Sequence, residues 1–179
     1  MQPYVETAIQ WLYDTLRCHM RALREWNPPP PPGEWVMLCW DVGHSLVRMQ
    51  ANGIPAQPVI EGVSEKLVAE FGDVADLTPG GIRVMRQFYL DYFERPHLQA
   101  ILRAISWDCH KIILAHCRDP LQQEFYLDLC RAKALDSEAL ALALKDRRYE
   151  VSAASSKALL VSKGGSRRSS VKGRVSPKA

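Results

Sequence analysis

Acidic and aromatic residues are absent from residues 151–179, the last stretch of the chain. The remaining part, 1–150, has 16 basic and 20 acidic residues, so the net charge of +3 divides into +7 for this tail and −4 for the body. A stretch with so few large apolar side chains cannot form a core. We therefore expect a folded domain over 1–150 and a disordered basic tail over 151–179. The positive charge of the whole chain belongs to the tail and is no evidence that the folded domain binds nucleic acid.

Long apolar runs are also missing. No stretch of the sequence reaches the roughly 18 apolar residues that cross a membrane, and the N-terminus lacks the charged-then-apolar pattern of a secretory signal. The five cysteines are an odd number without Cys-x-x-Cys spacing, which argues against a disulfide framework and suits a reducing compartment. These absences predict a cytoplasmic protein that does not use a membrane as a partner.

Patterns that bind cofactors or metals are scarce. The pair Gly80-Gly81 is isolated and lies outside any glycine-rich phosphate loop. Cys109-His110 and His116-Cys117 invite a zinc interpretation, but zinc ligands are usually spaced two to four residues apart in loops or knuckles. Cysteine is also a common core residue. We therefore expect no catalytic residue, no metal site and no cofactor.

Three helix starts lie between residues 77 and 126. Thr78 precedes Pro79, Ser106 precedes Trp107, and Asp119 precedes Pro120. A side-chain oxygen at the residue before a helix accepts a hydrogen bond from the first turn, and proline fits the first helical position because its missing N–H is not needed there. These pairs predict helices that begin at residues 79, 107 and 120.

The helix expected after Thr78 has two distinct faces. Spacings of three and four residues place Ile82, Met85, Tyr89 and Tyr92 on one buried stripe. The other flank has a short polar and basic set near the positive N-terminal end of the helix. Its members are Arg83, Arg86 and Gln87. Such a flank suits entry into a DNA groove, and it equally suits a solvated helix of a bundle.

Further helices are expected over 3–26, 34–50, 58–71 and 136–148, with a short helix or a loop over 97–105. Arg17, Arg21 and Arg24 form a basic strip on the first helix, which we interpret as a solvated face. The prolines of 28–32 predict a stiff spacer. Gly43 lies inside a helix, where glycine costs up to about 1 kcal/mol relative to alanine, so we expect it to permit a close helix crossing.

The order of these elements predicts an all-α, multi-helix domain. Helices over 58–71 and from residue 79, joined by a short connection, have the order of a helix-turn-helix. A short hairpin near Gly53–Gln57 would supply the wing of a winged helix, although no alternating apolar run marks it. The expected fold class is therefore all-α with a helix-turn-helix or winged-helix-like core.

The same stretches resemble a known family. Cys39–Gly43, Arg83–Tyr89, Ser106–Leu114 and Asp119–Leu127 are its most specific pieces, within a resemblance that covers about 35–144. Together they are similar to the N-terminal domain of the YhcG-type family, in which this domain precedes a nuclease domain of the PD-(D/E)XK superfamily. The resemblance implies a helical, DNA-associated module linked to restriction-type or other mobile-DNA functions.

The nuclease half of that family is not expected in this chain. A PD-(D/E)XK site needs an acid followed by Glu-x-Lys on paired strands to hold Mg²⁺ and activate water. The residues after Glu150 contain no acid, and Glu65-Lys66 lacks the intervening residue. We therefore expect a non-catalytic, cytoplasmic and bacterial protein.

DNA is the expected partner of this non-catalytic domain. The residues expected to contact DNA come from the helix flank and from the tail. They are Arg83, Arg86, Gln87, Lys163, Arg167, Arg168, Lys172 and Arg174. The alternative is a protein-interaction module that docks on a nuclease-bearing relative.

Overall fold

The computed structural model describes residues 3–25, 32–72 and 74–152 of the chain. Every regular element within these ranges is a helix, which confirms the expected all-α class. The elements are α1 (Pro3–Glu25), α2 (Pro32–Ala51), α3 (Ala56–Phe71), η1 (Ala75–Leu77), α4 (Pro79–Tyr92), η2 (Pro96–Leu98), α5 (Gln99–Ala104), α6 (Trp107–His116), α7 (Pro120–Lys133) and α8 (Ser137–Lys145), where η marks a 3₁₀ turn. A further helical turn covers 148–152.

The three predicted helix starts are confirmed by their caps. The N–H of Gly81 donates to Thr78 Oγ1 (3.2 Å) at the start of α4. Ser106 Oγ accepts from the N–H of Cys109 (3.4 Å) at the start of α6. Asp119 Oδ1 accepts from the N–H of Leu121 (3.4 Å) at the start of α7. Each bond satisfies an N–H that the helix itself leaves without a partner.

The starts of the second and third helices differ from the expected ones. The wing expected at Gly53–Gln57 is wrong: the chain turns at Gly53 (φ 82°) and enters α3 at Ala56, two residues before the predicted helix start. Pro55 is extended and precedes the first helical residue, which leaves no length for a strand. The second helix begins at Pro32, whereas the remainder of the proline spacer, 28–31, lies outside the described residues.

The chain divides into two units, Met1–Leu140 and Ala141–Ala179. Only 141–152 of the second unit are described, as the end of α8 and the short turn that follows. The boundary expected at residue 150 stays a prediction, as does the disorder of the tail beyond it. The candidate site and the fold that positions it lie in the first unit.

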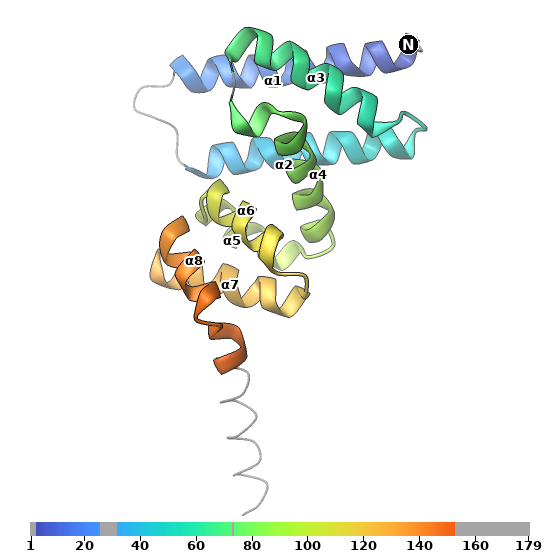
Figure 1. The fold of residues 1–179 in the computed structure, drawn as a ribbon. Coiled ribbons are helices and arrows are strands. Elements are labelled where there is room, and N and C mark those ends of the chain that lie inside the picture. The colour runs from blue at the N-terminus through green and yellow to red at the C-terminus, as the bar shows by residue number, and fades with distance from the viewer. Residues whose placement is uncertain (1–2, 26–31, 73, 153–179) are drawn as a thin grey trace, which may run out of the picture. The chain divides into compact units, whose positions relative to one another are not determined.

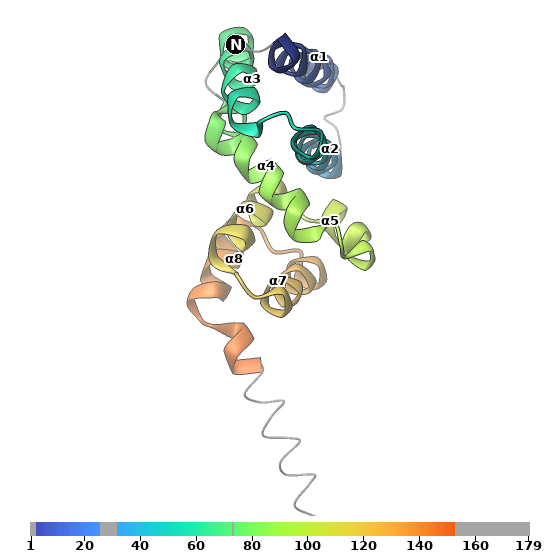
Figure 2. The same cartoon turned by 90° about the vertical axis from the view of Figure 1, so that its right-hand side faces the viewer.

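Helix α2 is central to the first unit. It packs most extensively against α4, and also against α1, α3, α5 and α6. α1 lies beside α3, and α4 leads from these three helices to α5, α6 and α7, as Figures 1 and 2 show from two directions. The core-facing residues of α2 are fully buried. They include Val36, Cys39, Val42 and Leu46.

The buried stripe of α4 is rotated from the predicted one. Ile82, Met85 and Tyr92 are buried as expected, but Phe88 is fully buried and Tyr89 only half-buried. The reason is that α4 packs on α6 as well as on α2. The Phe88 ring meets the ring of Trp107 edge-on at 5.2 Å, which draws the stripe toward α6.

Gly43 lies where α2 crosses α4, as predicted. A Cβ added at this position would overlap the carbonyl oxygen of Met85 and lie 2.7 Å from Cβ of Tyr89. Because real Cβ atoms do not approach other heavy atoms so closely, only glycine permits this crossing distance. The absence of a side chain therefore sets the separation of the two helices that pack together most extensively.

The basic strip of α1 is solvated as expected, with side-chain exposures of 38% for Arg17 and 54% for Arg21, and it also pairs with an acid on α3. Arg21 Nε and Nη2 both donate to Glu70 Oε1 on α3 (3.0 and 2.5 Å). Arg17 Nε lies 3.0 Å from Glu70 Oε2, and the Tyr13 hydroxyl donates to the same oxygen (2.5 Å). One carboxylate thus joins three side chains of α1 to α3. The side chain of Arg24 lies outside the described residues.

Replacing Glu70 with glutamine is expected to lower the melting temperature at neutral pH. The donated hydrogen bonds from Tyr13, and then those from Arg21 and Arg17, lower the pKa of Glu70 from 4.5 to about 2. The native state therefore releases this proton more readily than the unfolded chain, so the stabilisation is present above pH 4.5 and is lost as the pH falls toward 2. Thermal unfolding of both proteins between pH 2 and 7 measures the difference.

Glu65→Gln is the matched control, because Glu65 is exposed on the same helix. Its melting curve should follow that of the wild type at every pH. A difference between wild type and Glu70→Gln that stayed constant from pH 7 to pH 2 would contradict the role given to the ionised carboxylate.

Candidate nucleic-acid interface

Arg83 and Arg86, both predicted as DNA contacts, lie on one flank of α4 beside the turn that joins α2 to α3. Arg83 Nε donates to Oε1 of Gln57, near the start of α3 (3.3 Å). Arg86 Nη2 donates to Oε1 of Gln50, near the end of α2 (2.6 Å). Arg83 is exposed and Arg86 half-buried. We call Arg83, Arg86 and their two glutamine acceptors the basic flank.

Neither guanidinium of the basic flank forms an ion pair with a carboxylate in the described part of the chain. Both acceptors are neutral amides, so each hydrogen bond holds the side chain in place and leaves its charge uncompensated. The nearest link to an acid is indirect, because Gln57 donates in turn to Glu61. Several other cations do pair with acids. The pairs are Arg17 and Arg21 with Glu70, Arg95 with Glu124, Lys111 with Asp76 and Asp108, and Arg131 with Asp128.

Gln87, the third residue predicted on this flank, is hydrogen-bonded within its own helix, and its contact with DNA stays a prediction. Its side-chain amide donates to Asp91 of the same helix. Asp91 also accepts from the buried amide of Gln123 on α7 (3.2 Å), and Gln123 accepts from Arg95 Nη2 (3.1 Å). Gln87 therefore extends a polar network that ties α4 to α7. Its amide still lies at an exposed position of α4.

The network around Gln123 was missed from the sequence, although a signal for it exists. Gln123 lies at spacings of three, four and seven residues from Tyr126, Leu127 and Cys130, all of them buried. Helical periodicity thus places this amide on the core face of α7. A polar residue on such a face needs internal hydrogen-bond partners, and Asp91, Arg95 and the carbonyl of Cys117 supply them.

The predicted contacts of the tail lie outside the described residues. They are Lys163, Arg167, Arg168, Lys172 and Arg174. Their role stays a prediction that rests on the sequence alone. The interface described by structure is therefore confined to α4 and its neighbours.

Half-exposed rings continue along the same side of α4. The ring of Tyr89 stacks on that of His44 (centroids 5.1 Å apart, planes at 27°) and on that of Phe93 (5.4 Å, 16°). Trp40 meets Tyr89 edge-on at 4.9 Å. Phe93 is 44% exposed, and the other three rings are half-buried. We call Trp40, His44, Tyr89 and Phe93 the aromatic strip.

The aromatic strip was also missed from the sequence. Trp40 and His44 are four residues apart, and so are Tyr89 and Phe93, so each pair lies on one helix face. Sequence alone does not show that α2 and α4 cross at Gly43, which is what places the two pairs together. The strip thus depends on tertiary packing that the helix patterns do not specify.

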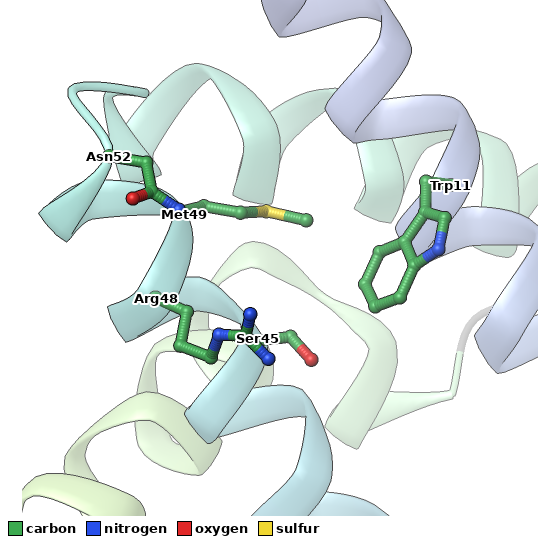
Figure 3. A pocket seen from close by; sticks show the side chains of 5 residues that line it. All are labelled: Trp11, Ser45, Arg48, Met49 and Asn52. Atoms are coloured by element: carbon green, nitrogen blue, oxygen red, sulfur yellow. The ribbon is translucent and has the colours of Figure 1, made fainter.

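A hollow of about 200 Å³ lies elsewhere, between α1 and α2. Figure 3 shows Met49 extending toward Trp11, with the side chains of Ser45 and Arg48 below them. Asn52 lines the hollow at the end of α2. Trp11 is 53% exposed.

Three of the four residues that suggested zinc are core residues, whereas His116 is exposed. Cys109, His110 and Cys117 are buried, and no three His, Cys, Asp or Glu side chains within the described ranges gather closely enough to hold a metal ion. Burial raises the pKa of the Cys39 thiol, and it raises that of Cys130 to about 12. These two groups are thiols rather than nucleophilic thiolates at neutral pH.

Comparison with known proteins identifies the family of the chain. A family model described as the DUF1016 N-terminal domain matches residues 32–151. This range contains the whole of the resemblance found from the sequence, about 35–144, and confirms it. No curated protein and no solved structure matches the chain. None of the helices in the described part is long and apolar enough to cross a membrane. Because the family match spans well over half of the sequence, the chain belongs to the DUF1016 N-terminal domain family.

Proposed function

We propose that this domain associates with DNA through the basic flank of α4, and that the basic tail adds sequence-independent affinity. One observation carries the proposal: Arg83 and Arg86 are held beside each other on α4 by neutral amides, with their charges uncompensated. Guanidinium groups fixed in this way are suited to phosphate oxygens, to which they donate charge-assisted hydrogen bonds. The resemblance to a DNA-associated module supports the same conclusion.

The net charge of −4 over 1–150 does not oppose such binding strongly. At physiological ionic strength the Debye length is about 8 Å, so charges on remote faces of the domain are screened from a bound phosphate. The charges close to the bound phosphate therefore determine whether the domain attracts DNA. Arg17 and Arg21 are neutralised by Glu70, whereas Arg83 and Arg86 keep their charge near the N-terminal half of α4. The helix dipole adds positive potential at that end.

In this proposal the domain performs no chemistry. It holds DNA for a nuclease-bearing partner of the kind that the family resemblance implies. The alternative function is docking on such a partner by the folded domain, without DNA contact. The exposed Trp11 beside the hollow between α1 and α2 favours that alternative and marks the surface that it would use.

The double variant Arg83→Ala/Arg86→Ala is expected to weaken DNA binding and to reduce its salt dependence. If the seven basic residues of the tail all neutralise phosphates, log K for the wild type includes a slope of about −6 against log salt from the tail. Each guanidinium of the flank that contacts a phosphate adds about 0.9 to the magnitude of this slope. The slope of the double variant should therefore be smaller in magnitude by about 2. Fluorescence anisotropy with a labelled duplex oligonucleotide, at salt concentrations from about 50 to about 200 mM, measures this slope.

A full-length variant with all seven basic tail residues changed to glutamine separates the two contributions. The proposal requires that this tail variant still bind DNA weakly at low salt. Adding Arg83→Ala/Arg86→Ala to it should abolish that DNA binding without changing the α-helical content. If the tail variant binds no DNA at all, the folded domain is not a DNA-binding surface. The docking function then takes its place, with Trp11→Ala as its first test.

A further inference from the structure

We propose that the aromatic strip stacks on unpaired bases, so that the nucleic acid recognised by this domain is single-stranded DNA. The inference rests on the proposed function and specifies its ligand. It is carried by the juxtaposition of two features on one side of α4. Arg86 of the basic flank lies three residues before Tyr89 and seven before Phe93, so the guanidinium and the two rings share one helix face.

The rings of the strip are arranged as a stack that ends in an exposed member. His44, Tyr89 and Phe93 lie with successive centroids 5.1 and 5.4 Å apart and with interplanar angles of 27° and 16°. Phe93, at the end of the stack and just after the last residue of α4, is 44% exposed. A ring presented at the end of a stack offers its remaining surface to a further planar group.

Bases in single-stranded DNA are such groups. Every base has a π face, so stacking on an aromatic side chain tolerates any sequence, whereas the faces of paired bases are hidden inside a duplex. Aromatic platforms beside a positive groove are the usual device for holding single strands, because the rings take the bases while the cations take the phosphates. The strip and the basic flank supply these two components from adjacent turns of α4.

Charge complementarity favours nucleic acid over an apolar occupant. Arg86 lies one turn before Tyr89 on α4, and its acceptor Gln50 is neutral. The carboxylate of Asp91 is engaged on the α7 side of α4 by Gln87 and Gln123. An apolar partner would leave the charge of Arg86 unpaired at the edge of its interface, whereas a phosphate would neutralise it.

The test compares single-stranded and duplex DNA of equal length with the full 179-residue chain. A labelled thymidine oligonucleotide of about 12 nucleotides spans a typical single-strand site. Wild type should bind it more tightly than the duplex. Phe93→Leu keeps an apolar side chain without a π face, and it should weaken single-strand binding roughly tenfold while changing duplex binding little. Phe93→Trp should retain the single-strand affinity.

Trp11→Leu is the matched control, because Trp11 is also an exposed aromatic residue and lies on α1, away from the strip. It should leave both affinities unchanged, and circular dichroism should show equal helical content in all variants. Binding to both DNA forms that Phe93→Leu does not alter would overturn this inference and leave the proposed function standing. Failure to bind either form would overturn both. A concentration-dependent dimer in sedimentation that Phe93→Leu abolishes would assign the strip to a second copy of the chain instead.

Discussion

Gly43→Ala is expected to lower the free energy of unfolding by about 2–3 kcal/mol, near the upper end of what overpacking a core usually costs. The added methyl group would overlap the backbone carbonyl of Met85 and lie 2.7 Å from Cβ of Tyr89. Backbone atoms cannot rotate away as the end of a side chain can, so α2 and α4 would have to separate along their shared interface. The higher helix propensity of alanine offsets at most about 1 kcal/mol of this cost. Chemical denaturation at neutral pH measures the change.

Gly80→Ala provides the opposite case within the same fold. Gly80 is exposed in the first turn of α4, and an added Cβ there would meet nothing closer than Thr78 Oγ1 at 3.7 Å. Alanine at this position should therefore stabilise the protein by up to about 1 kcal/mol through helix propensity. Equal effects of the two substitutions would show that helix propensity, and not the crossing of α2 and α4, determines the role of Gly43.

The helix starts and the glycine crossing were predictable because their causes are local. A cap depends on the residue itself and on the N–H groups two or three positions later, so Thr78, Ser106 and Asp119 could be assigned without knowledge of the fold. A glycine inside an amphipathic helix has an unfavourable propensity that packing has to compensate. Both kinds of signal are contained in a few neighbouring residues, and the structure confirms both.

Features that depend on residues far apart in the sequence were not predictable in this way. The pattern on α1 showed that Arg17 and Arg21 share a face, but not that Glu70 on α3 faces them, because that requires the packing of the two helices. The stripe of α4 was misplaced by one residue for the same reason. Periodicity fits Tyr89 as well as Phe88, and only the contact with α6 selects Phe88.

The candidate site likewise has features that were predictable from local sequence and features that depend on tertiary packing. Periodicity placed Arg83 and Arg86 correctly on one flank of α4, but it gave no information about their acceptors on α2 and α3. Those acceptors matter because an amide leaves the charge available, whereas a carboxylate would have removed it. The aromatic strip likewise exists only because α2 and α4 cross. Its rings come from two helices whose relative position the sequence patterns leave open.

His110 is the buried histidine of α6. It is fully buried among the rings of Phe88, Tyr92 and Trp107. Its Nε2 lies 2.9 Å from the carbonyl oxygen of Leu102, which can only accept, so Nε2 carries a proton and donates to that carbonyl. Nδ1 is buried and has no hydrogen-bond partner, so a second proton placed there would be a buried charge without compensation.

Acidification from pH 6.5 to about 4 is therefore expected to destabilise the wild type by roughly 3 kcal/mol relative to His110→Gln. Burial lowers the pKa of His110 from 6.5 to about 4, only partly opposed by its hydrogen bond to Leu102. Between these values the unfolded chain binds a proton that the native state does not, so stability rises with pH across this window. The contribution is complete above pH 6.5 and is lost as the pH falls to 4. Denaturant unfolding of both proteins at several pH values measures it.

Subtracting the two curves isolates His110, because groups common to both proteins cancel. Glu70 in particular acts below pH 4.5 and in both proteins alike. His116→Gln is the control, since His116 is exposed on the last turn of the same helix, and this variant should retain the pH slope of the wild type. A wild-type curve parallel to that of His110→Gln between pH 4 and 6.5 would mean that the native state admits the proton. Water would then have to reach Nδ1 past Phe88 and Trp107, and the junction of α4 with α6 would be more open than the contacts of these rings allow.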